Sequence, residues 1–534
     1  MDSKDILFGE DARSRVQAGM DLVADAVKVT LGPRGRNVII NINPQFGPPT
    51  IVNDGVTVAR AVMPTGEFEK TGATIIKGVA EKTNDVAGDG TTTATILMQA
   101  IVKAGMQQLG NGADAVALRR GIEEGTTRLL AEIDKQTVQT DDLTSLESVA
   151  TISCGDPKIG KIVAEVVHKL GVDGVITLED GEQEDTTYEL TEGLELRGGI
   201  QLPIFITHPA RQVTELENVP IFVTNHDLTN GIEMVKIMEI ASGHGHKEAV
   251  VIANSVNGEA MVSAVINRAQ GKFTLVPIRV QAWGETGEDL LRDVAAVTGA
   301  KFFSKDEGAR LPTSEQESYN WDDFGHADKL IATKERTTII GGGGDREARI
   351  EEVEAQIPNI KVAFRKEQVK ERVARLKSGV GLIQVGAVTD TELEERKLRV
   401  EDAINATKAA LDAGIVPGGG SALYRAAVAV RGELEAQQID PGYAAVLNAC
   451  EAPIRQMAAN SGFELSSHEL KRIAGDMALI IDFTTGETID GIAAGIIDPA
   501  KVVIAALKNA AGTAGIFLTS EVAIVPLEAK SATP

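Results

Sequence analysis

The chain has 534 residues, enough for several domains, and its content of 43% hydrophobic and 24% charged residues is typical of a soluble globular protein. Its formal net charge of −24 argues against nucleic acid as a main partner, because phosphate binding requires concentrated Lys and Arg. Two distant cysteines, Cys154 and Cys450, indicate a reducing compartment without a disulfide framework, and the seven histidines form no cluster with metal-ligand spacing.

The ends of the chain and its apolar runs bear on where the protein works. Residues 1–5 have no apolar core of signal-peptide length, and no stretch reaches the apolar length of a membrane span. We therefore expect a cytoplasmic protein without a membrane partner, whose acidity serves solubility.

The first 134 residues are predicted to be mainly helical. Val16, Met20, Val23 and Val27 fall on one face of a helix that should end near Thr30, where Leu-Gly-Pro-Arg-Gly follows. A second helical pattern precedes residue 88, and residues 96–109 form another that Gly110 closes.

The middle of the chain alternates strands and helices, which predicts an α/β domain. The expected strands are 174–178, 187–190, 221–224, 249–253 and 273–278, and the expected helices are 229–242, 258–270 and 286–299. Residues 345–377 return to charged helix with a break at Pro358, and residues 400–412 and 419–520 are largely helical. This order suggests that the two ends pack together around an inserted α/β block.

Residues 88–95, Gly-Asp-Gly-Thr-Thr-Thr-Ala-Thr, place an acid, two glycines and several hydroxyls at the start of a predicted helix. The glycines allow a tight turn close to a ligand, and Thr91–Thr93 offer hydroxyls and N–H groups at the positive end of the helix dipole. Asp89 would repel a phosphate unless a cation such as Mg²⁺ lies between them. The alternative is an ordinary N-capped helix, since Asp and Thr are good caps.

This segment resembles the nucleotide-binding motif of the bacterial-type (group I) 60-kDa chaperonins, the GroEL family. Five further segments match that family in the right order, so the resemblance covers nearly the whole chain. They are residues 29–38, 50–60, 400–403, 417–420 and 497–499.

The resemblance implies a multidomain fold, with a largely α-helical equatorial domain, a small α/β intermediate domain and an α/β apical domain. The equatorial, ATP-binding domain would comprise 1–134 and 413–534, the intermediate hinge domain 135–192 and 379–412, and the apical substrate-binding domain 193–378. Gly193, Gly379 and Gly414 fall at the expected hinges, although each is equally well explained as a turn or cap glycine.

The resemblance also assigns a site for ATP and Mg²⁺, with K⁺ as a further candidate ion. Asp89 would hold Mg²⁺, Asp54 would lie near the γ-phosphate, and Asp402 would orient or deprotonate the attacking water. For Asp402 the alternative is an exposed surface carboxylate. The phosphate cradle and the nucleoside contacts would come from Thr30, Leu31, Gly32, Pro33, Gly90, Thr91, Thr92, Thr93, Gly419 and Asp498.

Three departures from the family pattern surround this site. Asn53 stands where the family usually has lysine, Asp482-Phe483-Thr484 replaces Asn-Ala-Ala near the adenine, and Leu411 and Ala413 differ within the segment that leads to the glycines. We expect these changes to affect rates and nucleotide affinity more than the reaction.

The resemblance further implies an apolar surface that binds non-native polypeptides. The matching positions are Ile200, Ile204, Phe205, Val235, Met238, Met261, Val265 and Ile266. Their helical spacing is equally typical of stripes that pack inward. Isoleucines replace the usual aromatics at the first two positions, and residues 281–287 also differ from the family.

The implied partners are non-native chains, further copies of this chain in a seven-membered ring, and a co-chaperonin. The alternative function is a ring-forming scaffold or binding protein with residual ATPase and little folding activity. The altered apical residues and the lack of a Gly-Met-rich tail at 527–534 favour it, whereas the intact Asp54, Asp89 and Asp402 argue against it.

Overall fold

The computed structural model describes residues 4–41, 50–181, 183–209, 212–281, 284–312, 314, 316–360, 363–433 and 440–527. The chain divides into two compact units. Unit 1 comprises Met1–Val172, Leu178–Thr187 and Gln384–Pro534, and unit 2 comprises Asp173–Thr177 and Tyr188–Ile383. The two ends of the sequence therefore fold together, and an inserted segment forms the second unit, as the order of predicted elements suggested.

Unit 1 is mainly helical. Its helices are α1 (Gly9–Val27), α2 (Gly55–Ala61), α3 (Glu67–Ala87), α4 (Thr91–Gly110), α5 (Ala115–Gln136), α6 (Leu143–Cys154), α7 (Pro157–Leu170), α13 (Asp390–Ala413), α14 (Ser421–Glu433), α15 (Pro441–Ala449), α16 (Ala452–Ser461), α17 (Ser467–Gly475) and α18 (Ala500–Leu518). Its short strands pair in twos: β1 (Lys4–Phe8) with β20 (Val522–Pro526), β2 (Val38–Ile40) with β3 (Thr50–Val52), β16 (Ile415–Pro417) with β19 (Ile497–Pro499), and β17 (Leu479–Ile481) with β18 (Thr488–Asp490).

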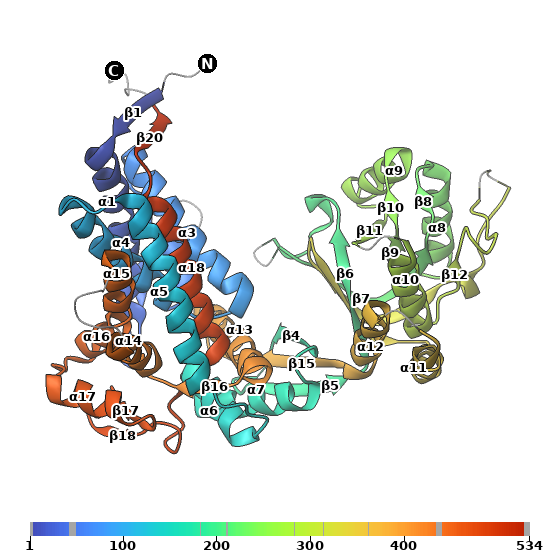
Figure 1. Ribbon diagram of the computed structural model, residues 1–534. Helices are drawn as coiled ribbons and strands as arrows, with labels where there is room; N and C mark the ends of the chain where they lie inside the picture. The colour runs from blue at the N-terminus through green and yellow to red at the C-terminus, as the bar shows by residue number, and fades with distance from the viewer. Residues whose placement is uncertain are drawn as a thin grey trace. The chain divides into compact units, whose positions relative to one another are not determined.

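The core of unit 1 combines segments from both ends of the chain. The predicted face of α1, with Val16, Met20, Val23 and Val27, is buried there, and a 3₁₀ turn at Lys28–Thr30 ends this helix region as expected. α18 packs against α3, α4 and α5, and β1 lies beside β20 (Figure 1). Hydrophobic burial thus joins elements that are about 400 residues apart in sequence.

α18 corrects one expectation from the sequence. By length and composition this helix could cross a membrane, although no stretch of that kind was expected. However, 61% of its apolar window is buried inside unit 1, where Leu507 and Ala510 are fully covered. Its apolar character is therefore explained by its place at the centre of the core.

Unit 2 is an α/β structure built on one sheet of seven strands. The sheet order is β12-β7-β13-β14-β6-β11-β9, and β7 also pairs with β9, so that six of the strands close into a ring. Its elements are β6 (Gly193–Ile200), β7 (Thr214–Thr224), β8 (Asp227–Leu228), α8 (Gly231–Gly243), β9 (Glu248–Ala253), β10 (Ser255–Val256), α9 (Gly258–Ala269), β11 (Thr274–Val280), α10 (Gly284–Thr298), β12 (Phe302–Phe303), β13 (Gly325–Ala332), β14 (Arg336–Gly342), α11 (Arg346–Glu354) and α12 (Ala363–Ser378).

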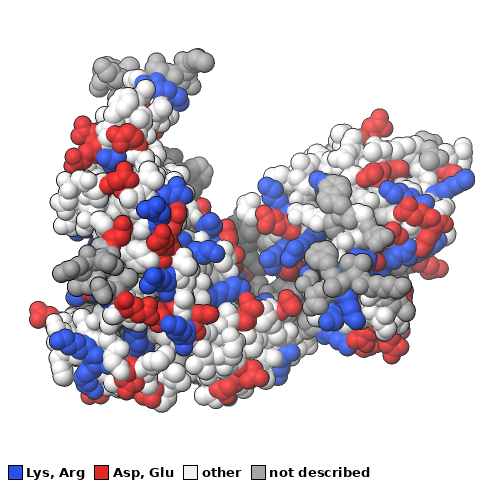
Figure 2. All heavy atoms as spheres, viewed as in Figure 1, with Lys and Arg blue, Asp and Glu red and all other residues white. Residues whose placement is uncertain are grey.

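The chain crosses between the units within a three-stranded sheet. Its strands are β4 (Val175–Asp180), β15 (Val380–Val385) and β5 (Thr187–Thr191), in the order β4-β15-β5. On the face shown in Figure 2, acidic and basic side chains are interspersed over both units.

Most predicted elements are present within a few residues of the expected bounds. The break at Pro358 falls in a 3₁₀ turn, Ile357–Asn359, between α11 and α12. β6, β13 and β14 were not predicted as strands. Unit 2 contains the whole segment expected as the apical domain, whereas the equatorial and intermediate segments both lie mainly in unit 1, and their division stays a prediction. Residues 282–283 and 528–534 lie outside the described residues.

Candidate functional site

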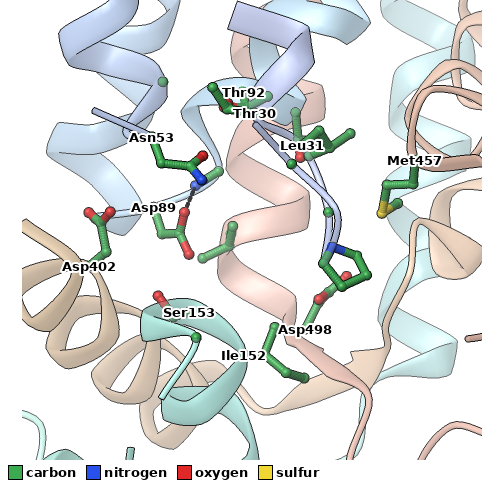
Figure 3. Close-up of a pocket in the computed structure, with 18 of the residues that line it drawn as sticks. Thr30, Leu31, Asn53, Asp89, Thr92, Ile152, Ser153, Asp402, Met457 and Asp498 are labelled. Atoms are coloured by element: carbon green, nitrogen blue, oxygen red, sulfur yellow. Dashed lines mark hydrogen bonds between the residues drawn. The ribbon is translucent and has the colours of Figure 1, made fainter. Parts of the chain in front are cut away.

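A cavity of about 760 Å³ lies within unit 1. Every residue predicted for the nucleotide site lines it: Thr30, Leu31, Gly32, Pro33, Asp54, Asp89, Gly90, Thr91, Thr92, Thr93, Asp402, Gly419 and Asp498. Figure 3 shows Asp89 between Asp402 on one side and Leu31, Met457 and Asp498 on the other, with Asn53 above it. The structure thus brings together positions that are up to about 470 residues apart.

The turn between α3 and α4 holds Asp89 between two glycines in the left-handed region. Gly88 has φ of 70° and Gly90 has φ of 84°, conformations that a side chain disfavours. A Cβ at Gly88 would lie 2.2 Å from Cβ of Asn405, and one at Gly90 would lie 2.6 Å from Cγ1 of Val502. Both glycines are therefore required by backbone conformation and by packing.

The N-terminus of α4 opens onto the cavity. Its N-cap residue is Gly90, and within the described part of the chain no side chain caps it. The Asp89 carboxylate instead accepts a hydrogen bond from the N–H of Gly90. The interpretation of 88–95 as an ordinary N-capped helix is therefore wrong, and the N–H groups of Thr91–Thr93 remain available at the positive end of a 20-residue helix.

A second helix N-terminus meets the first. Asp54 caps α2, where its carboxylate accepts hydrogen bonds from the N–H groups of Val56 (3.1 Å) and Thr57 (2.8 Å). A Cβ at Gly55 would lie 2.3 Å from Oγ1 of Thr92, so the starts of α2 and α4 are in close contact. The convergence fixes both Asp54 and the Thr91–Thr93 segment against the cavity.

The loop after α1 forms another wall. The hydroxyl of Thr30 donates to the carbonyl of Val27 (2.9 Å) and lies 3.3 Å from Oγ1 of Thr92. The amide of Asn460 donates to the carbonyl of Leu31 (2.9 Å), which ties the loop to α16. Gly32 has φ of 85° and faces the side chain of Met457.

Three carboxyl groups of the cavity have raised pKa values. Burial raises the pKa of Asp89 above its ordinary value, and repulsion from Asp54 adds to this. Burial and the neighbouring Asp89, Asp54 and Glu401 hold the pKa of Asp402 well above its usual range. Burial and Asp89 raise the pKa of Asp498 to about 7. Raised pKa values of this kind are typical of carboxylates that lie close together in a poorly solvated space, where a bound cation would offset their repulsion.

The far side of the cavity is more apolar. Phe483 and Met457 belong to a small apolar cluster against which Leu31 packs, so this side suits the flat face of a base. Gly419 has φ of 67°, and a Cβ there would lie 3.4 Å from the carbonyl of Ile481. Asp482 of the unusual Asp-Phe-Thr segment is held by the N–H of Thr484 and the hydroxyl of Thr485, at 2.8 and 2.9 Å.

Several lining residues were missed by sequence reasoning. Ile152 and Ser153, at the end of α6, and Met457 of α16 reach the cavity through folding contacts that no local pattern reports. Arg399 also lines it, and its position three residues before Asp402 on α13 was a usable signal, because i and i+3 share a helix face.

The residues present fit a magnesium-bound phosphate. Among the residues that the structure describes, no group of three or more His, Cys, Asp or Glu is arranged to hold a metal ion by itself. Mg²⁺ in nucleotide sites, however, is held by one or two carboxylates together with phosphate oxygens. Asp89 beside the hydroxyls of Thr91 and Thr92 supplies oxygen ligands of that kind, next to Gly55, where a Cβ would press against both hydroxyls.

The eight predicted substrate positions of unit 2 divide by exposure. Ile200, Phe205 and Met238 are buried in the core, whereas Met261 and Val265 are half-buried and pack against it. Ile204, Val235 and Ile266 are exposed, and sequence reasoning missed two exposed neighbours, Leu202 and Val262.

We call Leu202, Ile204, Val235, Val262 and Ile266 the unit-2 apolar surface. They lie on α8, on α9 and in or beside the 3₁₀ turn Pro203–Phe205, and α9 contacts both of the other elements. The inward-packing alternative therefore holds for part of the predicted set. The exposed apolar surface is smaller than expected, and it includes two residues, Leu202 and Val262, that were not predicted.

The fold and the site together are those of a chaperonin. An α/β unit is inserted into a helical unit, and the helical unit holds a cavity with two helix N-termini and clustered carboxylates. The chain matches the TCP-1/cpn60 chaperonin family over residues 23–526, and it belongs to this family. It is an ATP-dependent folding chaperonin, and the family match does not favour the scaffold alternative. The expected fold class is confirmed.

Two solved structures share the fold. Both are crystal structures of the chaperonin gp146 from the bacteriophage EL 2 (Pseudomonas aeruginosa) in the presence of ATP-BeFx. Crystal form II has a TM-score of 0.70 and 24% identity over 98% of this chain and 99% of that one. Crystal form I has a TM-score of 0.65 and 23% identity over the same shares of the two chains.

Proposed function

We propose that this chaperonin hydrolyses ATP in the unit-1 cavity and uses the reaction to bind and release non-native polypeptides. The observation that carries the proposal is the uncapped N-terminus of α4, preceded by Asp89 and its two left-handed glycines. Free N–H groups and the positive end of a helix dipole suit phosphate oxygens. The presence of ATP-BeFx in the gp146 crystals supports a nucleotide as the ligand.

Asp89 would hold Mg²⁺, and K⁺ is a further candidate cation beside the same oxygens. When bound, Mg²⁺ neutralises phosphate charge that the surrounding carboxylates would otherwise repel. The capping bonds from Val56 and Thr57 keep the Asp54 carboxylate in one orientation, from which it would face the terminal phosphate.

Asp402 would take the proton from the attacking water. A general base works best when its pKa lies near the working pH, and the burial and repulsion that raise the pKa of Asp402 move it in that direction. The side chain comes from the middle of α13, and it lies to one side of Asp89 in Figure 3.

The unit-2 apolar surface would bind the non-native chain. Apolar side chains exposed next to one another are favourable contacts for the unpaired hydrophobic segments of an unfolded protein. Val262 is 55% exposed and Ile266 is 46% exposed on neighbouring turns of α9, so both are available in this conformation.

Ring assembly would use apolar side chains at the strand pairs of unit 1. Phe8 and Ile524, in the β1–β20 pair, are 65% and 62% exposed, and Ile39 in the β2–β3 pair is 71% exposed. Two-stranded sheets present open edges that another chain can extend. We propose a homo-oligomeric ring of seven subunits in the cytoplasm, with a co-chaperonin as a further partner.

The test is ATP-dependent refolding of a chemically denatured enzyme without a co-chaperonin, together with the ATPase rate. Asp402→Ala should lower the rate by about 100-fold or more. Glu394→Ala, an exposed acid on the same helix, should leave it unchanged. A normal rate in Asp402→Ala would remove this residue from the mechanism, and refolding by the wild type alone would establish a complete folding cycle.

A further inference from the structure

The charges around the unit-1 cavity are strongly unbalanced. Six acidic side chains line it: Asp54, Asp89, Glu395, Asp402, Asp482 and Asp498. Among the described lining residues, Arg399 is the only lysine or arginine. A nucleoside triphosphate carries several negative charges, which at these separations would be strongly repelled by the carboxylates in a partly buried site. A single Mg²⁺ ion offsets only part of that repulsion.

The position of Arg399 relates it to the reacting end of the cavity. It lies on α13, three residues before Asp402, so both side chains leave the same face of the helix. Nη1 of Arg399 lies 3.4 Å from the place that a Cβ on Gly155 would take, next to the α6 residues Ile152 and Ser153 that line the cavity. The guanidinium therefore lies beside the end of α6, on the helix face that also carries Asp402.

Glu395 holds this guanidinium by an ion pair one turn earlier on α13. The Arg399 side chain is 37% exposed, compared with 21% for Glu395, so the cation remains accessible to solvent while its partner is more covered. A guanidinium carries five N–H donors in a rigid fork and can pair with a phosphate without giving up a carboxylate on its other side. Asn53 carries no charge that could take this role.

We propose that Arg399 pairs with the terminal phosphate of the bound triphosphate and makes the cavity selective for ATP over ADP, while Glu395 acts as its positioning residue. This inference rests on the proposed ATPase function. Arg399 and Asp402 lie on one helix, α13. A movement of this helix would therefore bring to the substrate both the cation that stabilises the phosphate charge and the base that takes the proton. An arginine supplied by the same chain stabilises developing charge in other phosphoryl transfers.

The experiment measures the dissociation constants of ADP and of the non-hydrolysable β,γ-imido analogue of ATP by calorimetry at fixed salt and Mg²⁺, on the full chain. Arg399→Ala should weaken the triphosphate about tenfold more than ADP, the size expected for one charge-assisted hydrogen-bonded pair. Arg399→Lys should recover part of the selectivity, because the charge remains but the fork is lost. Glu395→Gln should reduce the selectivity for the triphosphate over ADP by a smaller factor than Arg399→Ala does.

Arg119→Ala is the matched control. Arg119 forms the same kind of i,i+4 pair with Glu123 on α5 and does not line the cavity, so its loss should leave the affinity ratio unchanged. If Arg399→Ala does not fold, Arg399→Gln removes the charge and keeps much of the side-chain length. If the wild type binds the triphosphate but Arg399→Ala leaves the ratio of the two dissociation constants unchanged, this inference alone is overturned. A wild type that binds neither nucleotide would overturn the proposed function as well.

Discussion

A Cβ atom on Gly55 would stand 2.3 Å from the hydroxyl oxygen of Thr92, closer than any real contact allows. This relationship joins the N-termini of α2 and α4, and through them the carboxylate of Asp54 and the backbone N–H groups of the phosphate cradle. The two elements are separated in sequence by the whole of α3, yet their first residues are in contact.

Gly55→Ala is therefore expected to destabilise unit 1 by about 1–3 kcal/mol, as overpacking does in a tight interior. It should also weaken nucleotide binding, because the two helix starts must separate to admit the methyl group. Gly78→Ala is the control, since a Cβ there meets no described atom within 4 Å in the middle of α3. Urea unfolding and nucleotide titration check both variants, and equal behaviour of the two would contradict the packing argument.

The raised pKa of Asp498 predicts a pH-dependent stability. Its native pKa of about 7 lies above the unfolded value of about 3.9, so the native state holds a proton that the unfolded state has lost. The contribution of Asp498 to the free energy of unfolding is therefore fully present below about pH 4 and is lost as the pH rises toward 7.

Asp498→Asn should remove that dependence. The variant is expected to be more stable than the ligand-free wild type by about 1–3 kcal/mol at pH 8, with little difference near pH 4. Asp134→Asn, an exposed acid on α5, should show no such divergence. Urea midpoints across the pH range measure the effect, and parallel curves for wild type and Asp498→Asn would refute it.

Nucleotide binding with Mg²⁺ is expected to release protons. Burial raises the pKa of Asp89 and of Asp402, with Asp54 adding to the shift of both, and a cation that binds the charged carboxylates would lower these pKa values and displace bound protons. The apparent affinity should accordingly rise as the pH increases. Calorimetry in two buffers of different ionisation enthalpy counts the protons, and Asp402→Asn should release fewer. Identical heats in both buffers would show that the groups bind no protons before the ligand arrives.

The unit-2 apolar surface predicts a separation of substrate binding from stability. Val262→Ser with Ile266→Ser should reduce the capture of a denatured protein several-fold and leave the ATPase rate and unfolding midpoint nearly unchanged, because both side chains are exposed. Phe205→Ala should instead destabilise unit 2 by about 3–5 kcal/mol, since Phe205 is fully buried. Val116→Ser, on an exposed position of α5, controls for lost surface hydrophobicity. Normal capture by the double variant would exclude this surface.

The helices of unit 1 and the nucleotide cavity could be predicted because their signals are local or belong to ordered motifs. Val16, Met20 and Val23 report a helix face by spacing alone, and residues 88–95 carry their glycines and acid in one turn. β6 could not be predicted in the same way, since its Gly-Leu-Glu-Leu-Arg-Gly-Gly-Ile sequence becomes a strand only through pairing with β14 and β11.

The sequence also could not show which side chains of an apolar helix stripe are buried and which are exposed. Met238 and Val235 are three residues apart on α8, but the first is buried against the sheet and the second is 37% exposed. Periodicity shows that side chains share a direction, and only the packed structure shows what lies there. Ser153 joined the candidate site for the same reason, because α6 and α13 meet at the cavity from distant parts of the chain.

The packing of α18 at the centre of unit 1 has a consequence for the synthesis of the protein on the ribosome. α3, α4 and α5 are made early, but α18, which packs against all three, is made near the end of the chain. At ordinary rates of translation, roughly 20–80 s pass between the completion of α4 and the synthesis of α18. During that interval the N-terminal helices expose the surface that their missing partner will bury. For most of its own synthesis, this chain therefore exposes apolar helix faces of the kind that protein-binding surfaces recognise.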